Sequence, residues 1–459
     1  MLNALMALAV LATPLSAQTS PSSGQPALKW SACPIADAPQ LQCADLPVAL
    51  APGNDRKITL KVARLPATGV KKGSVLVNFG GPQGYQIASL GSRTQIFDKI
   101  RTSMDVVTWD PRGYAGLSGA VLQCDWGFVR TPDFPADQAG FDRIAAANKA
   151  RADKCRSTDP ALFDHMDSAS DARDADAIRQ ALGEDKMNFL GLSYGGTIAQ
   201  SYARLFPQRV RTMYIDGTKS HSPRNWEREL DAMARETEGF MDRFFAWAPA
   251  GTEKRWRALV AKANREPIPA PKVEAEFNGT QLQATGFLKL RSGPTNWGAF
   301  VAAIAAAEAG DASDFALSSR QPYPGVPGGG YKECLDFPRP ADQRAVARTA
   351  KRLRAIAPNT GASFALAWHL PLTCAGWPTP VTNPPKPMPR TLPPFLGAGA
   401  WQDYDSTRRV VEQIPGSRTI RHDGPGHNLF GAMANPCVIG HVSAYITERR
   451  LPPKGTTCP

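Results

Sequence analysis

The most informative pattern in the chain is the pentapeptide GLSYG at residues 191–195, which fits G-x-S-x-G. In this pattern the serine lies at a tight strand-to-helix turn, so that its hydroxyl projects outward as a nucleophile. Side chains two residues before or after the serine would collide with neighbouring elements, and glycine is therefore needed at both positions. An apolar run at 187–192 and a helix-forming run at 197–206 flank the motif, as this turn requires. Ser193 is thus the predicted nucleophile of acyl transfer, and its alternative, an ordinary helix N-cap serine, is disfavoured by this context.

A nucleophilic serine needs a general base, and five histidines follow it in the chain: His221, His369, His422, His427 and His441. The predicted base is His427, because it follows a Gly-Pro-Gly turn directly after the last predicted strand, at 418–423. From such a loop the imidazole can swing over the carboxyl edge of a sheet. His422 lies within that strand, where a packing or surface role is expected.

A carboxylate must orient this imidazole, and in sites of this kind the acid comes between the serine and the histidine in chain order. We expect it in the loop after the preceding strand, predicted at 394–400, where Asp403 and Asp405 are found. Asp403 lies where that strand should end and is the preferred acid, with Asp405 as the alternative acid. Either aspartate could instead be a carboxylate at the start of the next helix, where the helix dipole favours negative charge.

The oxyanion that forms during acyl transfer needs preorganised N–H donors. One predicted donor is the amide of Tyr194, the residue after the nucleophile. The second is expected from the glycine-rich loop FGGPQG at residues 79–84, which follows an early strand, and Gly80 and Gly81 are its candidates. The alternative for these glycines is a plain tight turn.

Alternating strands and helices are expected to position these residues. The first half predicts strands at 58–65, 74–78, 104–109, 187–192 and 212–215, and helices at 170–182 and 197–206. Most of these strands are short and apolar throughout, as a parallel sheet covered on both faces requires. The alternation predicts an α/β fold with a doubly wound, mostly parallel sheet and helices on both faces.

The pattern changes after Gly217. Helical stretches are predicted at 225–247 and 302–309, the PIPAP run at 267–271 breaks the chain, and no clear strand alternation is seen from 222 to 370. A Pro-rich connector at 371–394 then precedes the strand at 394–400, a short helix at 406–413 and the last strand. We therefore divide the chain into four parts: a signal peptide at 1–17, a first core part at 18–217, an inserted helical cap at 218–370, and the connector with the second core part at 371–459.

Composition excludes several classes of protein. The 459 residues are 42% hydrophobic and 20% charged, which excludes a disordered chain. The net charge of +12 is not gathered in Lys/Arg blocks, so a basic surface is expected and no nucleic-acid binding. The chain has eight cysteines and no C-x-x-C, which favours disulfides over a metal site or buried free thiols. Pairing sequence neighbours gives Cys33–Cys43, Cys124–Cys155, Cys334–Cys374 and Cys437–Cys458, each worth about 3–4 kcal/mol.

The N-terminus reads as a secretory signal peptide. Residues 2–17 are uncharged and mostly apolar, are interrupted by Pro14, and end in Ser16 and Ala17, which predicts cleavage after Ala17. No Lys or Arg precedes the apolar run, and the alternative is a retained anchor. No later stretch approaches the roughly 18 apolar residues of a membrane span. The mature chain is therefore expected to be secreted or periplasmic, with no stable membrane insertion.

Taken together, several stretches resemble the secreted tripeptidyl/prolyl aminopeptidase branch of the α/β-hydrolases: VNFGGPQGY, VTWDPRGYAGLS, ALGEDKMNFLGLSYGG, LFPQRVRTMYIDG, CAGWP and DGPGHNLF. The resemblance covers nearly the whole mature chain. It implies an α/β-hydrolase fold with Ser193 as nucleophile, His427 as base, Asp403 as acid, and a helical cap inserted after Gly217. Two departures are visible. The family's acid is usually followed by a Pro-x-Thr-Pro turn, which this shorter segment lacks, and Gln83 stands where the family usually has glycine.

The resulting functional hypothesis is an exported serine hydrolase, an aminopeptidase that releases residues or short peptides through a Ser-His-Asp triad, without a metal or organic cofactor. Such an enzyme needs a carboxylate to hold the substrate's α-ammonium, and the candidates in the inserted segment are Glu227, Glu229, Glu236 and Glu333. Each could equally be a solvated helix charge. The rival hypothesis is a carboxylesterase acting on small or aromatic esters, and a minor alternative is a non-catalytic binding protein. The sequence does not specify the oligomeric state.

Overall fold

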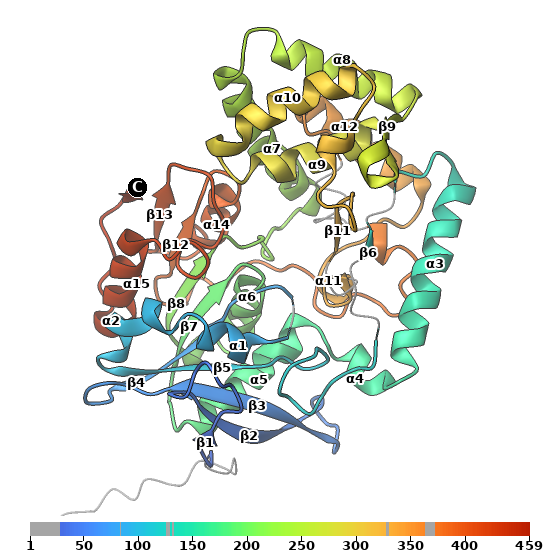
Figure 1. Ribbon diagram of the computed structural model, residues 1–459. Coiled ribbons are helices and arrows are strands. Elements are labelled where there is room, and N and C mark those ends of the chain that lie inside the picture. The colour runs from blue at the N-terminus through green and yellow to red at the C-terminus, as the bar shows by residue number, and fades with distance from the viewer. Residues whose placement is uncertain (1–27, 83, 125–128, 131–132, 327–329, 363–371) are drawn as a thin grey trace, which may run out of the picture.

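The computed structural model describes residues 28–459 except 83, 125–128, 131–132, 327–329 and 363–371 (Figure 1). The predicted signal peptide, Gln83 and His369 lie outside the described residues. Within the described ranges, no helix combines the length and the apolar character needed to cross a bilayer.

Among the described residues, ten strands form one sheet in the order β1-β2-β3-β5-β4-β7-β8-β12-β13-β14. The first three strands are antiparallel to their neighbours, and every pair from β5 to β14 is parallel. The strands are β1 (Ser31–Ala32), β2 (Gln42–Ala49), β3 (Lys57–Leu65), β4 (Gly73–Asn78), β5 (Met104–Trp109), β7 (Met187–Leu192), β8 (Val210–Asp216), β12 (Leu396–Gly399), β13 (Arg418–His422) and β14 (Thr457–Cys458). Because the strands from β4 to β13 are parallel, the loops that follow them meet at one edge of the sheet.

Strand β2 is not among the strands expected from the sequence. Its run contains Pro47, and a proline argues against a strand with partners on both sides. In the structure β1 pairs only with residues 42 and 43 of β2, so Pro47 has a partner strand on one side only. The proline is tolerated because β1 does not extend as far as Pro47, so β2 is the edge strand of the sheet at this position.

Helices cover both faces of the sheet (Figure 1). On one face α5 (Ser168–Ala181), α6 (Gly195–Leu205) and α14 (Tyr404–Val411) contribute to one apolar cluster. On the other face α1 (Gln86–Gly91), α2 (Asp98–Arg101) and α15 (Pro436–Glu448) contribute to a second cluster. The strands β4, β5 and β7 are buried along their whole length, which explains why their sequences are apolar without alternation. The chain therefore has the α/β-hydrolase architecture, with a mostly parallel sheet between two helical layers.

A mostly helical segment lies between β8 and β12 in the chain and above the carboxyl edge of the sheet (Figure 1). The helices among its described residues are α7 (Trp226–Trp247), α8 (Thr252–Arg265), α9 (Gly279–Leu290), α10 (Trp297–Glu308), α11 (Glu333–Asp336) and α12 (Gln343–Ile356). Helices α3 (Gln138–Arg156) and α4 (Pro160–Asp164) precede α5 in the core. Aromatic side chains fill a separate core between α7, α8, α9 and α10. We refer to residues 218–370 as the cap.

The cap also contains short strands that the sequence did not predict. Strand β9 (Ile268–Ala270) pairs with β10 (Ala275–Phe277), and β11 (Gly325–Val326) pairs with β6 (Val129–Arg130) from the core. The PIPAP run therefore breaks the helices but forms one strand of a two-stranded ribbon. A proline is compatible with such a ribbon because each strand has a partner on one side only.

The eight cysteines form four disulfides between sequence neighbours: Cys33–Cys43, Cys124–Cys155, Cys334–Cys374 and Cys437–Cys458. The bridge from Cys334 joins α11 of the cap to the segment that leads back into the sheet. The bridge from Cys437 joins α15 to the edge strand β14.

Candidate active site

Ser193 lies at the turn between β7 and α6, with a left-handed backbone at φ 53°. A Cβ added to Gly191 would come within 2.6 Å of the Gly195 carbonyl oxygen. A Cβ added to Gly195 would come within 2.4 Å of the Asn78 carbonyl oxygen. Glycine is therefore required at both positions because strand and helix approach each other closely, and this approach leaves the Ser193 side chain facing the open edge of the sheet.

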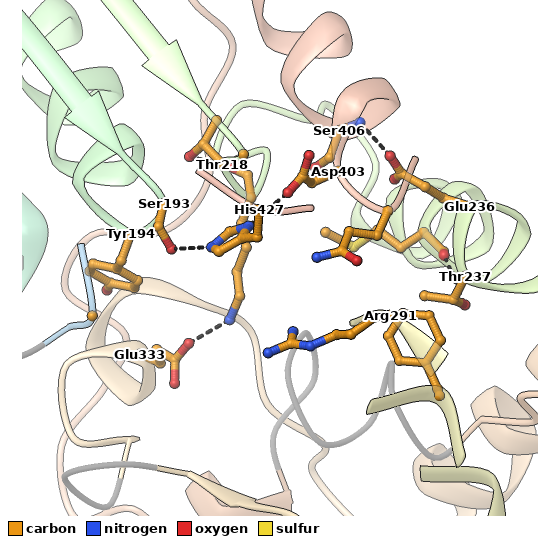
Figure 2. Close-up of a pocket in the computed structure, with 16 residues that line it drawn as sticks. Ser193, Tyr194, Thr218, Glu236, Thr237, Arg291, Glu333, Asp403, Ser406 and His427 are labelled. Carbon is orange, nitrogen blue, oxygen red and sulfur yellow. Dashed lines mark hydrogen bonds and ion pairs between the residues drawn. The ribbon is translucent and has the colours of Figure 1, made fainter. Parts of the chain in front are cut away.

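The structure brings Ser193, His427 and Asp403 into one hydrogen-bonded series (Figure 2). Nε2 of His427 lies 2.9 Å from Oγ of Ser193, and Nδ1 lies 2.7 Å from Oδ2 of Asp403. The other carboxylate oxygen of Asp403 accepts a hydrogen bond of 2.8 Å from the amide of Ala400, just after β12. Each of the three side chains thus comes from a loop that follows a parallel strand.

Asp405 does not take part in this series. Helix α14 begins at Tyr404, two residues earlier than expected, so Asp403 is its N-cap residue and Asp405 lies in its first turn. The carboxylate of Asp405 pairs with Arg408 at 3.0 Å. The structure therefore gives the two aspartates different partners, with Asp403 facing the imidazole.

The electrostatic environment of His427 favours its cation. Burial by itself disfavours the charged ring, but the hydrogen bond and the negative charge of Asp403 outweigh this effect, and the pKa of His427 is raised above its ordinary value. The positive charge of Arg291 acts in the opposite direction to Asp403. An imidazole in this setting readily accepts a proton from the neighbouring hydroxyl.

The two glycines of the loop 79–84 differ in what their amides contact. The Gly80 amide donates to Oδ1 of Asn78 at 3.0 Å, so it is not available for an oxyanion. Gly81 lines the cavity together with Ser193 and Tyr194, and among the described residues neither the Gly81 nor the Tyr194 amide has an acceptor. The expected donor from this loop is thus corrected to Gly81 alone. The amide of Gly80 is engaged because the turn folds back on the end of β4.

Asp216, at the end of β8, is hydrogen-bonded both to the nucleophile and to the loop that contains His427, and it is not among the residues predicted from the sequence. Its backbone carbonyl accepts a hydrogen bond of 2.8 Å from the Ser193 amide. Its carboxylate accepts hydrogen bonds from the Phe430 amide at 2.8 Å and from the Tyr214 hydroxyl at 2.9 Å. Burial raises the pKa of Asp216 to about 6, and the charge of Asp403 adds to this effect. A carboxylate directly after the apolar run 213–215, at the end of a buried strand, was the available signal.

A cavity of about 260 Å³ opens over Ser193, between the sheet and the cap (Figure 2). The core side includes Ser193, Tyr194, Asp403 and His427. The cap contributes eight residues: Thr218, Lys219, Met233, Glu236, Thr237, Phe287, Arg291 and Glu333. The cavity is therefore closed on the cap side by both apolar and charged side chains.

The four candidate carboxylates of the cap fall into two groups. Glu227 is exposed, and the buried Glu229 pairs with Arg409 at 2.8 Å; neither lines the cavity. Glu236 and Glu333 both line it. Glu333 forms an ion pair with Lys219.

Glu236 lies against the N-terminus of α14. Its Oε1 accepts hydrogen bonds from the amides of Asp405 at 2.9 Å and Ser406 at 3.3 Å, and its other oxygen lies 3.8 Å from Arg409. Burial raises the pKa of Glu236 well above its usual range, partly opposed by Arg409. The carboxyl of Glu236 is thus fixed in position, and burial disfavours its ionised form, which Arg409 stabilises only in part.

Two family models match the chain. The α/β hydrolase fold matches residues 95–272, which include Ser193, and the model described as TAP-like protein matches residues 362–458, which include Asp403 and His427. The two matches lie on either side of most of the cap.

Curated relatives match nearly the full length at 28% identity. They include the tripeptidyl aminopeptidase of Streptomyces lividans, covering 91% of this chain and 83% of that protein. They also include the serine protease Hip1 of Mycobacterium tuberculosis, covering 95% of this chain and 92% of that protein. A third is carboxylesterase B of the same species, covering 98% and 95%.

Proposed function

Because this chain belongs to the α/β-hydrolase family and has a TAP-like segment at its C-terminus, we propose that it is an exported serine hydrolase of the aminopeptidase type. Its substrates would be peptides, from whose N-termini it releases residues or short peptides. The observation that carries the proposal is the hydrogen-bonded series Ser193–His427–Asp403 beneath a cavity that also contains Glu236.

In the proposed reaction, Oγ of Ser193 attacks the scissile carbonyl while Nε2 of His427 takes the hydroxyl proton. Asp403 holds the Nδ1–H of the ring and stabilises the imidazolium. The carbonyl oxygen becomes an oxyanion that accepts hydrogen bonds from the amides of Gly81 and Tyr194. His427 then gives its proton to the leaving amine, and a water molecule, deprotonated by the same ring, hydrolyses the acyl-enzyme and restores the serine.

Recognition of a free N-terminus requires an anion for the α-ammonium, and Glu236 meets this requirement better than Glu333. Glu333 is already paired with Lys219. Glu236 is held by two amides and has no cation closer than Arg409 at 3.8 Å among the described residues. Burial removes the water that would stabilise an ionised Glu236. The positive charge of an incoming ammonium would take over this role and favour the ionised carboxylate. We therefore assign the α-amine site to Glu236.

Export is supported by the four disulfides, since such bridges persist mainly in oxidising compartments. The predicted signal peptide at 1–17 agrees with export and lies outside the described residues.

A carboxylesterase is the second candidate function, and the relative named carboxylesterase B favours it. Ester hydrolysis would use the same triad and the same oxyanion donors. It would not need the ammonium site at Glu236, so the requirement for a free α-amine separates the two functions.

The test compares three substrate types: peptidyl anilides with a free amine, their N-acetylated forms, and short-chain aryl esters. We expect kcat/KM to fall by at least ~100-fold on acetylation, because the buried carboxyl of Glu236 loses its cation. Glu236→Gln should remove most of this difference, whereas Glu227→Gln, on the same helix but exposed, should leave it intact.

Labelling by a fluorophosphonate supplies the second measurement. Wild type should be labelled at Ser193, and Ser193→Ala should be neither labelled nor active. Equal turnover of free and acetylated anilides, or turnover of esters alone, would replace the aminopeptidase by the carboxylesterase. Labelling at another residue would remove Ser193 from the mechanism.

A further inference from the structure

Arg291 is a positively charged residue in the cavity that the proposed mechanism does not use. It follows directly after Leu290, the last residue of α9, and its backbone amide closes the helix by donating to the Phe287 carbonyl at 3.0 Å. Figure 2 shows its guanidinium extending from the cap into the cavity, toward the side where Glu333 lies. The position is set by the end of a helix and not by a flexible loop.

The carboxylates around the cavity already have other partners. Glu333 pairs with Lys219, and Asp403 faces His427. Glu236 accepts hydrogen bonds from two amides of α14. Among the described residues, no carboxylate lies within ion-pair distance of the Arg291 guanidinium. One positive charge of the cavity wall is therefore left without a partner.

A partly buried guanidinium without a counter-charge is less stable than one paired with an anionic group of a ligand. Burial lowers the pKa of Arg291, and only the charge of Asp403 opposes this effect. A guanidinium presents a planar fork of N–H donors that matches a carboxylate through two parallel hydrogen bonds. A carboxylate that enters with the substrate would fit this group better than any neutral substituent.

We propose that Arg291 binds a carboxylate of the substrate, so that the enzyme prefers acidic substrates. The inference deepens the proposed function and rests on it, because it describes the substrate of the same cavity. The carboxylate could come from an Asp or Glu side chain in the released N-terminal part, or from the α-carboxylate just beyond the scissile bond. Glu236 and Arg291 would then hold opposite charges of one substrate.

The test uses matched substrate pairs. The side-chain arm compares free-amine mono-, di- and tripeptidyl anilides in which one residue at a time is Glu or Gln. The terminal arm compares short peptides with a free C-terminus and their C-terminal amides. We expect a preference of roughly ten- to hundredfold in kcat/KM for the carboxylate member of one pair, because a charge-assisted pair is formed in a partly buried site.

Arg291→Met should bring this ratio close to one, and Arg291→Lys should keep part of it, because the charge remains but the fork is lost. Arg354→Met is the matched control. Arg354 is also a cap arginine whose pKa burial lowers, but it lies over the Phe134 ring and does not line the cavity. Arg354→Met should show the same carboxylate-to-neutral ratio of kcat/KM as the wild type.

Two further measurements separate this inference from the aminopeptidase assignment. The first compares an aryl ester that carries a distal carboxylate with the methyl ester of that carboxylate. The second measures by calorimetry the affinity of Glu- and Gln-containing peptides for Ser193→Ala with and without Arg291→Met. A charge preference that disappears in Arg291→Met supports the inference even if acetylated substrates are cleaved equally well. The inference would be overturned if Arg291→Met left the carboxylate-to-neutral ratio of kcat/KM unchanged and did not alter the affinity for Glu-containing relative to Gln-containing peptides.

Discussion

The hydrogen bonds around His427 give its two ring nitrogens different tasks. The carboxylate of Asp403 can only accept, so Nδ1 carries the proton of the neutral ring. Nε2 is then the acceptor that faces the Ser193 hydroxyl at 2.9 Å. The position of one carboxylate thus decides which nitrogen can act as the base.

Replacing Asp403 should therefore have a different effect from replacing Asp405. Asp403→Asn would keep the geometry but favour the wrong tautomer, and we expect kcat to fall by up to ~10⁴-fold. Asp405→Asn would remove only the pair with Arg408, and we expect less than ~10-fold in kcat, since exposed pairs contribute under about 1 kcal/mol. Steady-state kinetics of both variants on one substrate tests the order. A larger loss for Asp405→Asn would make Asp405 the orienting acid.

The pH dependence of kcat/KM should report the raised pKa of His427. Only the neutral ring accepts the serine proton, so activity should rise with pH through that pKa, with a midpoint above the ordinary value of about 6.5. Asp403→Asn removes the main group that raises the pKa of His427. Burial and Arg291, which lower this pKa, remain, and only the weaker effect of the Asp216 charge still raises it, so the midpoint should move to lower pH. The profile is measured on a neutral aryl ester, because a substrate amine would titrate in the same range. A midpoint that does not move in Asp403→Asn would contradict the role given to this pair.

At the scale of the elements, the site depends on the close approach of the loop segment 79–82 to the strand-to-helix turn at Ser193. Gly80 has a left-handed backbone at φ 94°, and a Cβ there would come within 2.6 Å of the Leu192 carbonyl oxygen and 2.7 Å of Ser193 Cβ. Gln86 fixes the same loop by accepting from the Phe79 amide at 2.7 Å and donating to the Gly80 carbonyl at 3.0 Å. The loop is thus held against the nucleophile from both sides, which positions the Gly81 amide.

Gly80→Ala should lower kcat by roughly 10²- to 10³-fold, the usual effect of losing one oxyanion donor, because the new methyl group would push the loop away. Gly53→Ala is a suitable control. Gly53 is also left-handed, at φ 74°, but nothing lies within 4 Å of an added Cβ. The control should cost about 1 kcal/mol of stability and leave kcat unchanged. Equal kcat losses in the two variants would show that backbone strain, and not the close approach, is responsible.

At the scale of the whole molecule, the cavity lies between two units, the sheet with its helical layers and the part of the cap formed by α7 to α10. The sheet with its helical layers has two apolar clusters, one of which also includes Tyr331 and Phe337 of the cap, and α7 to α10 have an aromatic core of their own. The triad comes from the first unit, while Glu236 and Arg291 come from the second. Chemistry and recognition are therefore located on different parts of the chain.

The disulfide Cys437–Cys458 lies in the first unit, between α15 and β14, and neither cysteine lines the cavity. Replacing both cysteines by serine should lower the free energy of unfolding by about 3 kcal/mol, because the unfolded chain gains entropy. At temperatures where the variant is folded, kcat should stay at the level of wild type. Denaturant unfolding and kinetics measure the two effects. A free-thiol assay on unfolded, unreduced wild type should read near zero, and a stoichiometric thiol would contradict the four bridges.

Local sequence patterns determined the fold class and the motif that contains Ser193. Doubly apolar strands, amphipathic helices and the spacing of Gly191 and Gly195 each depend on contacts within a few residues of one another, so they can be read without a structure. The order of the parallel strands then brought the loops that contain Asp403 and His427 to one edge of the sheet. The sequence could therefore predict which loops meet, and it named the three residues that the structure brings together.

Only the tertiary structure decided which side chain in each loop faces the cavity. Asp403 faces His427 because α14 begins at Tyr404, and a start two residues later would have changed the partners of both aspartates. The Gly80 amide donates its hydrogen bond to Asn78 and does not face the cavity. Of the four candidate cap carboxylates, only Glu236 and Glu333 line the cavity. These outcomes depend on contacts between segments far apart in the chain. Sequence spacing does not encode such contacts, because a shift of one or two residues in a loop or at a helix start redirects every side chain that follows.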